Sequence, residues 1–223
     1  LVNPWAAGCV PLGSGRDALR LVIRHGRDAL GWRRLWVPSY MCQHVVESIV
    51  QTGIPCTLYR DDPTRPYPEQ GSLTPDPDDA VLLVNYLGRR TGEVLDHIDL
   101  HGAALIVDHT HDPWSTWALE DRADWAVASL RKTLPIPDGG VLWSPLGHEL
   151  PAAPPLTRTR LEAANAKWKA MRLKGHYLAG ELVKKADFRA LALEGEAAIA
   201  AGDISAVWPD TWMRLATLPV TAW

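Results

Sequence analysis

The chain has 223 residues, of which 47% are hydrophobic and 22% charged, and its formal net charge is −3. That length allows one large domain with a sizeable core, and the composition is ordinary for a globular protein. The charge favours neither nucleic acid nor anionic membranes as partners, and no apolar run reaches the ~20 residues of a membrane span. Cys9, Cys42 and Cys56 match no metal or redox spacing, so we expect no metal and a reducing cytoplasm.

Helices and strands alternate through the first part of the chain. Ser14 can cap a helix over residues 15–29, in which Leu19, Val22 and Ile23 recur at helical spacing. The elements expected next are a strand at 35–38, a helix at 40–51, a strand at 56–60 and an irregular loop, rich in Pro and Asp, at 61–79.

Two continuous apolar runs, at 80–88 and 103–110, have the composition of strands buried on both faces. Weaker strand patterns follow at 124–130 and 139–143. Strands separated by helices predict an α/β fold, a three-layer sandwich with a mostly parallel central sheet. We expect residues 1–145 to form this large domain and residues 146–223 to form a helical C-terminal segment.

The C-terminal segment opens with a Pro-rich linker at 144–156, and a helix rich in Lys and Arg is expected from about 157 to 185. Trp168, Met171, Leu178 and Leu182 can share one face of that helix, with the basic side chains elsewhere. The basic face is open to two interpretations, a solvated surface or a site for an anionic ligand.

Four polar positions lie where an α/β sheet binds ligands, at the carboxyl ends of strands or the start of a helix. Each has a purely structural alternative. The GSGRDAL turn at 13–19 either binds an anion at a helix N-terminus or only caps the helix. Asp108 either contacts a ligand or caps the turn after its strand, and Asn85 either hydrogen-bonds a ligand or closes a loop. Lys132 is either a reactive amine or an ordinary solvated side chain.

Together these positions suit an aromatic aldehyde cofactor that carries a phosphate and a pyridine nitrogen. Such a group needs a helix N-terminus for the phosphate, a carboxylate for the ring nitrogen and an amine for a Schiff base. Gly15, Asp108 and Lys132 could supply these in chain order.

The chain resembles the pyridoxal-phosphate-dependent aminotransferases of fold type I, particularly the DegT/DnrJ/EryC1/StrS group. The matching segments are SGRDAL, VPSYMCQHVVESIVQTGIPCTLY, VNYLG, IVDHTHDPW and SLRKTLPIPDGGVL, which occur in family order over roughly residues 13–143. The resemblance implies pyridoxal 5'-phosphate as cofactor, a homodimer, and transfer of an amino group from an amino acid to a keto or aldehyde acceptor. Many members of the group aminate nucleotide-linked sugars.

Residue roles follow from the same resemblance. Lys132 would form the Schiff base and then move the substrate proton, while Asp108 would pair with the ring nitrogen and His111 would lie beside the ring. The set expected to contact the cofactor comprises Ser14, Gly15, Arg16, Tyr40, Cys42, Asn85, Asp108, His111, Ser129 and Lys132. Within it, Gly15 and Arg16 would offer backbone N–H groups to the phosphate, and Ser129 its hydroxyl.

Departures from the family pattern concern the ring and the substrate. Cys42 aligns with the position that usually stacks on the cofactor, so that Tyr40 is the alternative aromatic group. Lys132 follows Ser129 more closely than is common in the family. Members run about twice as far past the lysine, and the chain begins at Leu1 rather than Met, which favours an incomplete or processed chain with a shortened small domain.

Two other functions compete with an aminotransferase. A shortened, non-catalytic relative could keep the fold as a binding or partner module, although such a module has no need of Asp108, His111 and Lys132 together. An unrelated nucleotide-binding α/β domain could use GSGRDAL for phosphate, but the sequence has neither GxGxxG spacing nor a P-loop lysine.

Overall fold

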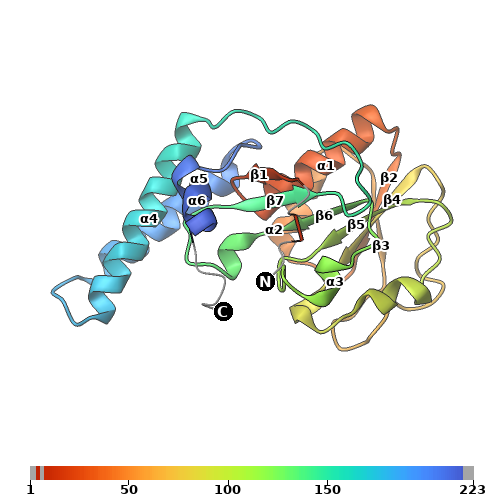
Figure 1. Cartoon of the computed structure of the whole chain (residues 1–223), viewed down its shortest axis with the longest axis horizontal. Coiled ribbons are helices and arrows are strands. Elements are labelled where there is room, and N and C mark those ends of the chain that lie inside the picture. Colours follow the sequence, from red (N-terminus) through yellow and green to blue (C-terminus); the bar gives the residue numbers. More distant parts are fainter. Residues whose placement is uncertain (1–3, 6–7, 218–223) are drawn as a thin grey trace.

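A seven-stranded sheet forms the centre of the molecule, seen in the computed structural model of the chain, which describes residues 4–5 and 8–217 (Figure 1). The strand order is β1-β7-β6-β5-β4-β2-β3. The five strands from β6 to β3 are parallel, whereas β7 runs antiparallel to both of its neighbours. The strands are β1 Val10–Leu12, β2 Arg34–Pro38, β3 Cys56–Tyr59, β4 Asp79–Val84, β5 Ala104–Asp108, β6 Trp125–Ala128 and β7 Gly140–Trp143.

Helices connect and cover these strands. The α-helices are α1 Gly15–Ala29, α2 Gln43–Val50, α3 Thr116–Leu119, α4 Arg158–Leu178, α5 Lys185–Ala201 and α6 Pro209–Thr217. Short 3-10 turns form η1 Tyr86–Gly88, η2 Gly92–His97 and η3 Leu130–Lys132. This mixed α/β architecture with a mostly parallel sheet confirms the predicted fold class. No helix in the described ranges is long and apolar enough to cross a membrane.

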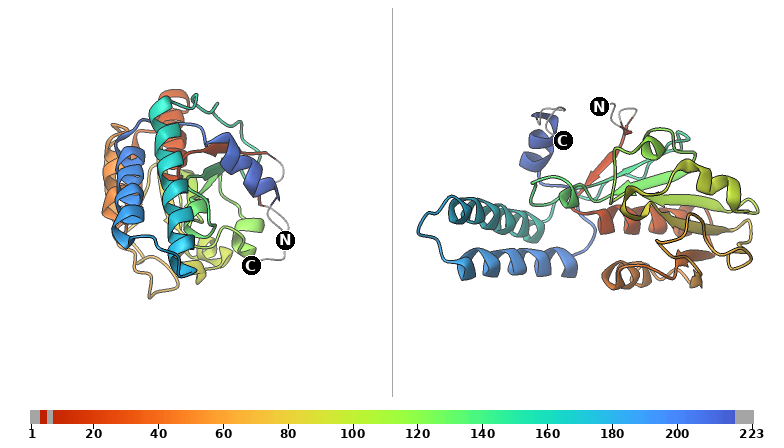
Figure 2. Two further views of the ribbon diagram at one scale, coloured as in Figure 1. Left: turned by 90° about the vertical axis from the view of Figure 1, so that its left-hand side faces the viewer. Right: turned by 90° about the horizontal axis from the view of Figure 1, so that it is seen from below.

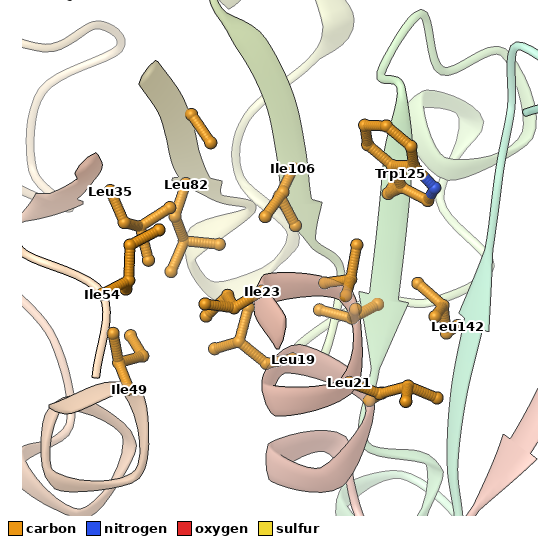
Figure 3. Close-up of a cluster of buried hydrophobic side chains, with 14 of the residues drawn as sticks. Leu19, Leu21, Ile23, Leu35, Ile49, Ile54, Leu82, Ile106, Trp125 and Leu142 are labelled. Carbon is orange, nitrogen blue, oxygen red and sulfur yellow. The ribbon is translucent and has the colours of Figure 1, made fainter. Parts of the chain in front are cut away.

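One face of the sheet is covered by α1 and α2. Leu19 and Ile23 of α1 project toward Leu82 and Ile106 of the central strands, and all four side chains are at most 1% exposed (Figure 3). Burying a side chain of this size stabilises the fold by about 1.5–3 kcal/mol. The helical spacing of these apolar residues therefore fixes which side of α1 meets the sheet.

The opposite face is covered by α3, the 3-10 turns and the loop before β4. Val81, Leu83 and Val107 project into a second apolar cluster with Trp117 of α3. The irregular loop expected at 61–79 has no helix or strand before Asp79. A buried ion pair holds its start, because Arg90 donates to both carboxylate oxygens of Asp61 at 2.6 and 2.9 Å.

The C-terminal segment is a helical hairpin that projects away from the sheet (Figure 2, right). Its α4 and α5 pack along one another, and the chain then returns to the sheet. Gly13 N–H donates to Ser205 C=O at 2.9 Å, and the Asp138 carboxylate accepts from Trp208 N–H at 2.8 Å and from the Thr211 hydroxyl. These bonds attach the end of the segment to the turns beside α1 and β7.

The main differences between the element boundaries and the sequence-based expectations are the following. The second helix begins at Gln43 rather than residue 40. The segment before it is held by the Tyr86 hydroxyl, which donates to Tyr40 C=O. The strand predicted at 80–88 ends at Val84 and turns into η1. The helix predicted to reach residue 185 ends at Leu178, which leaves Leu182 fully exposed in the α4–α5 connection.

Candidate functional site

The carboxyl ends of β4, β5 and β6 and the N-terminus of α1 meet at one edge of the sheet (Figure 1). Because β7 is antiparallel to both β1 and β6, β1 runs in the same direction as the central strands. The helix that follows β1 therefore starts at the same edge where the central strands end. Asp108 closes β5 and Ser129 follows β6, so both belong to this edge.

The N-terminus of α1 has unused hydrogen-bond donors. Ser14 caps the helix, since its hydroxyl oxygen accepts from Asp17 N–H at 3.1 Å. The backbone N–H groups of Gly15 and Arg16 have no partner among the residues the structure describes. Such first-turn donors, together with the helix dipole, favour an anion.

Gly15 lies against Ser129, and this contact requires glycine. A Cβ at Gly15 would lie 2.7 Å from the Ser129 Cβ, closer than two carbon atoms can pack. The DGG turn after Lys132 supports the same corner, because Gly139 N–H donates to Gly13 C=O at 2.9 Å. A Cβ at Gly140 would lie 2.2 Å from the backbone of Ser14. The GSG and DGG turns thus enclose the start of α1 together with Ser129.

Thr110 connects the ends of β5 and β6. Its backbone N–H donates to Asp108 Oδ1 at 2.8 Å, and its hydroxyl oxygen accepts from Ser129 N–H at 2.9 Å. The half-buried Asp108 carboxylate keeps its second oxygen without a partner within the described ranges. Sequence reasoning missed Thr110, whose only signal was a hydroxyl residue two positions after the candidate carboxylate.

Lys132 and His111 complete the group at this edge. Lys132 is exposed at the end of η3, and its ammonium forms no ion pair with any described residue. Burial lowers the pKa of His111, and the charge of Lys132 lowers it further, while Asp108 opposes the shift. His111 Nδ1 accepts from Leu87 N–H at 3.1 Å. The ring is therefore held near the lysine and the carboxylate in its neutral form.

Tyr40 and Cys42 lie on the segment that leads into α2. The Tyr40 side chain is 61% exposed, and its ring meets Tyr86 edge to face at 5.7 Å. Tyr86 begins the η1 turn just after β4 ends, which places the pair close to the same edge. Burial raises the pKa of Tyr86, and the charge of Asp61 adds to this shift. Cys42 is exposed as the N-cap residue of α2 and makes no side-chain capping bond.

Asn85 differs from the other candidates because its side chain is fully buried. Its Nδ2 atom lies 3.2 Å from the Ser115 hydroxyl and 3.4 Å from His109 Nδ1. His109 in turn contacts Asp121 through Nε2 at 2.8 Å, with both side chains fully buried. The Oδ1 atom of Asn85 is buried and has no hydrogen-bond partner among the described residues. His109 was not singled out from the sequence.

The Arg16 side chain joins an ion cluster with the C-terminal segment. Glu196 of α5 accepts from Arg131 at 2.7 and 2.8 Å and from Lys167 at 2.7 Å. Arg16 contacts the same carboxylate at 3.3 Å. Burial tends to raise the pKa of Glu196, but these hydrogen bonds outweigh it and lower the value to about 2. The members of this cluster are far apart in the sequence, so no local sequence pattern indicates it.

Comparisons with known proteins find a likeness in structure only. No protein-family model and no curated protein matches the sequence. An archaeal O-phosphoseryl-tRNA(Sec) selenium transferase aligns at a TM-score of 0.50 with 16% identity, over 62% of this chain and 38% of that chain. PseC from Helicobacter pylori, an aminotransferase involved in the biosynthesis of pseudoaminic acid, aligns at 0.50 with 15% identity, over 63% and 40%.

A DegT DnrJ EryC1 StrS aminotransferase from Brucella abortus also aligns, at a TM-score of 0.44 with 16% identity, over 63% of this chain and 42% of that chain. Identities this low define a shared fold and nothing finer. The chain has the sheet architecture found in the selenium transferase and in PseC, and it spans about 40% of the length of these proteins.

Proposed function

We propose that the chain binds pyridoxal 5'-phosphate and acts as an aminotransferase that passes an amino group from an amino acid to a keto or aldehyde acceptor. One observation carries the proposal. Three groups lie at the same edge of the sheet: the helix N-terminus with free donors at Gly15, the carboxylate of Asp108 and the amine of Lys132. The aminotransferase fold of a structural neighbour supports it.

The residues present fit this cofactor. The unpartnered N–H groups of Gly15 and Arg16, with the Ser129 hydroxyl beside them, suit a phosphate. The free oxygen of Asp108 suits a protonated pyridine nitrogen, and the unpaired Lys132 amine suits the aldehyde carbon. When bound, the cofactor supplies an electron sink for the substrate carbon that loses its proton.

The chain's own residues would then position groups and move protons. Lys132, which is exposed and free of ion pairs, can carry a proton between the substrate carbon and its Nζ atom. Thr110 N–H donates to the Asp108 carboxylate and orients it, so Asp108 would be the group that holds a protonated pyridine nitrogen. His111 accepts from Leu87 N–H, which orients its imidazole, and it would contact the bound cofactor. Tyr40 is the aromatic group available to lie against the ring.

Finer features extend the proposal. We assign residues 1–145 to a cofactor-binding large domain and 146–223 to a shortened small domain; residues 1–3, 6–7 and 218–223 lie outside the described part of the chain. A nucleotide-linked sugar is the proposed acceptor, in keeping with the resemblance and with the pathway named for PseC. Assembly as a homodimer in the cytoplasm completes the assignment.

Cofactor binding tests this proposal directly. Pyridoxal phosphate added to the purified protein should produce a new visible absorbance band and raise the melting temperature, because it binds the folded state. Lys132→Ala should abolish the band, while Lys169→Ala, which removes an exposed lysine of α4, should leave it unchanged. An absent band in the unaltered protein would refute the assignment.

A second candidate is a non-catalytic module with the same fold. The coverage of about 40% of the neighbours' length supports this candidate, because the part of the neighbours that this chain does not match could carry part of their substrate site. The two candidates separate when the cofactor-loaded protein is mixed with amino acids such as glutamate. An aminotransferase converts the cofactor to its amine form, visible as a change of spectrum, and a module binds without conversion.

A further inference from the structure

The strand β3 lies at one end of the sheet, and part of its outer edge has no partner in the described part of the chain. Among the described strands it pairs only with β2, on its inner side. There the C=O groups of Pro55 and Tyr59 accept backbone hydrogen bonds at 2.8 Å. In a parallel pair, successive residues turn their backbone groups alternately toward and away from the neighbouring strand. The N–H and C=O groups of Cys56 and Leu58 therefore point outward, where no described residue bonds them.

Both ends of this open stretch are closed within the chain itself. At the far end, Arg60 N–H donates to the Ser72 hydroxyl at 3.1 Å, and Arg60 C=O accepts from Glu69 N–H at 3.0 Å. At the near end, Ile54 N–H donates to the Thr52 hydroxyl oxygen at 3.4 Å. Unpaired strand edges serve as templates for a strand of another chain. This edge is therefore a short template with defined ends.

The side chains along the open edge are exposed and carry no charge. The Leu58 side chain is 63% exposed, and Cys56 is exposed as well. Their register partners in β2, Leu35 and Val37, belong to the core cluster that α1 and α2 cover, so Cys56 and Leu58 project from that same face. Exposed edges are commonly guarded by Lys or Pro, but the strand CTLY contains neither. Nothing in the strand therefore opposes pairing with another chain.

The outer side of α2 extends this apolar surface. Val50 is 61% exposed, and Val46, one turn earlier, is half-buried. Both valines lie on the side of α2 turned away from α1, since His44 and Gln51 line a pocket on the α1 side. Because α1 contacts β1, β6 and β7, the side away from it faces the end of the sheet that β3 forms. A chain that pairs with β3 therefore meets apolar side chains of α2 as well.

We propose that the open edge of β3 pairs with the same edge of a second copy of this chain, antiparallel and about a two-fold axis at Thr57. In this register Cys56 lies opposite Leu58 of the second copy, and Leu58 lies opposite its Cys56. Opposite residues whose backbone groups face each other exchange both hydrogen bonds, so every open group in both copies gains a partner. The apolar side chains of each opposite pair also pack together. Because the pairing uses up the edge, association ends at a dimer.

The closed ends of the edge select this register. An axis at Cys56 would set Leu58 against Ile54 of the second copy, and an axis at Leu58 would set Cys56 against its Arg60. Ile54 N–H and both backbone groups of Arg60 are already bonded, so only the axis at Thr57 satisfies the whole edge. The surface specifies the homodimer named in the proposed function and rests on that part of it, not on the cofactor.

A cysteine at Thr57 tests the register. The Thr57 residues of the two copies would form a non-hydrogen-bonded pair with Cα atoms ~4.5 Å apart, within the ~4.4–6.8 Å that a disulfide spans. The native Cys56 residues would lie diagonally at roughly 7–8 Å, too far for a disulfide without backbone movement. Mild oxidation should therefore give a covalent dimer of Thr57→Cys on a non-reducing gel. The unaltered protein and Thr64→Cys, which adds a thiol in the exposed loop after β3, should give none.

A charge at Leu58 tests the surface in solution. Leu58→Lys places an ammonium group from each copy beside the axis, so the Kd of the dimer should rise by about tenfold or more. Leu193→Lys is the matched control, because it makes the same change at a leucine of α5 that is 68% exposed and distant from β3. Sedimentation velocity on the protein without cofactor measures the dimer, and circular dichroism confirms that each variant is folded.

The expected result is a dimer of the unaltered protein and of Leu193→Lys, a folded monomer of Leu58→Lys, and cross-linking only in Thr57→Cys. Undiminished dimers of Leu58→Lys, cross-linking through Cys56, equal cross-linking of Thr57→Cys and Thr64→Cys, or species larger than a dimer would each overturn the proposed surface. A monomeric unaltered protein would overturn the surface and the homodimer together. The absorbance band of pyridoxal phosphate, recorded on the same samples, tests the cofactor assignment separately, so the two failures are distinguishable.

Discussion

Replacing Glu196 with Gln should weaken the attachment of the C-terminal helices to the sheet domain. The folded-state pKa of about 2, against an ordinary value of 4.5, corresponds to about 3.4 kcal/mol at 1.36 kcal/mol per unit. The side chain is 40% exposed, and burial lowers the pKa of its partner Lys167, so solvent screening and desolvation reduce this figure. We expect Glu196→Gln to lower the free energy of unfolding by about 1–2 kcal/mol at pH 7.

Urea unfolding at several pH values checks both size and sign. Because the folded-state pKa of Glu196 is depressed, its stabilisation is complete above about pH 4.5 and is lost as the pH falls through 2. The difference between the unaltered protein and Glu196→Gln should narrow over that interval. Glu194→Gln, an exposed residue of the same helix, should change stability by less than about 0.5 kcal/mol. Equal effects of the two variants at pH 7 would refute the reasoning.

Three further changes probe the candidate site. Gly15→Ala should destabilise the protein by about 1–3 kcal/mol in urea unfolding, because the new Cβ would overlap Ser129. Gly175→Ala in α4, where a Cβ meets nothing, should instead stabilise the protein by about 0.5–1 kcal/mol. Equal effects of the two changes would contradict the close contact between Gly15 and Ser129. Thr110→Val should lower the free energy of unfolding by about 1–3 kcal/mol, because Ser129 N–H loses its acceptor, whereas Thr110→Ser should keep the acceptor and the stability. Unchanged stability of Thr110→Val in calorimetry would exclude a contribution from this hydrogen bond. His111→Gln should lose less stability on acidification below pH 6.5 than the unaltered protein, because the lowered pKa of His111 favours its neutral form in the folded state. Identical pH profiles of the two proteins would argue against a lowered pKa.

Much of the sheet could be predicted from local patterns. The apolar runs that became β4 and β5 are buried on both faces, which continuous hydrophobic sequence indicates directly. The capping role of Ser14 and the helix after it could also be predicted from the sequence, since both depend on neighbouring residues. The strand β1 was missed because three residues are too few for a periodic pattern.

The candidate site was only partly readable from the sequence. Asp108 and Lys132 could be singled out because each follows a strand pattern, and the direction of the strands brings them to one edge. The buried placement of Asn85 depends on His109 and Ser115, which no local signal connects to it. The contact between Arg16 and Glu196 joins residues 180 positions apart, so only the folded chain reveals it.

The central claim is that Lys132 is the amine that reacts with pyridoxal phosphate. Borohydride reduction of the cofactor-loaded protein, followed by digestion and mass spectrometry of the peptides, locates any covalent attachment. We predict a single phosphopyridoxyl group on Lys132. No corresponding pyridoxyl group should form when unphosphorylated pyridoxal replaces the cofactor at the same concentration, because the proposed phosphate site at the α1 N-terminus and Ser129 would not be used. Label spread over surface lysines such as Lys169, or no label on Lys132, would contradict the account.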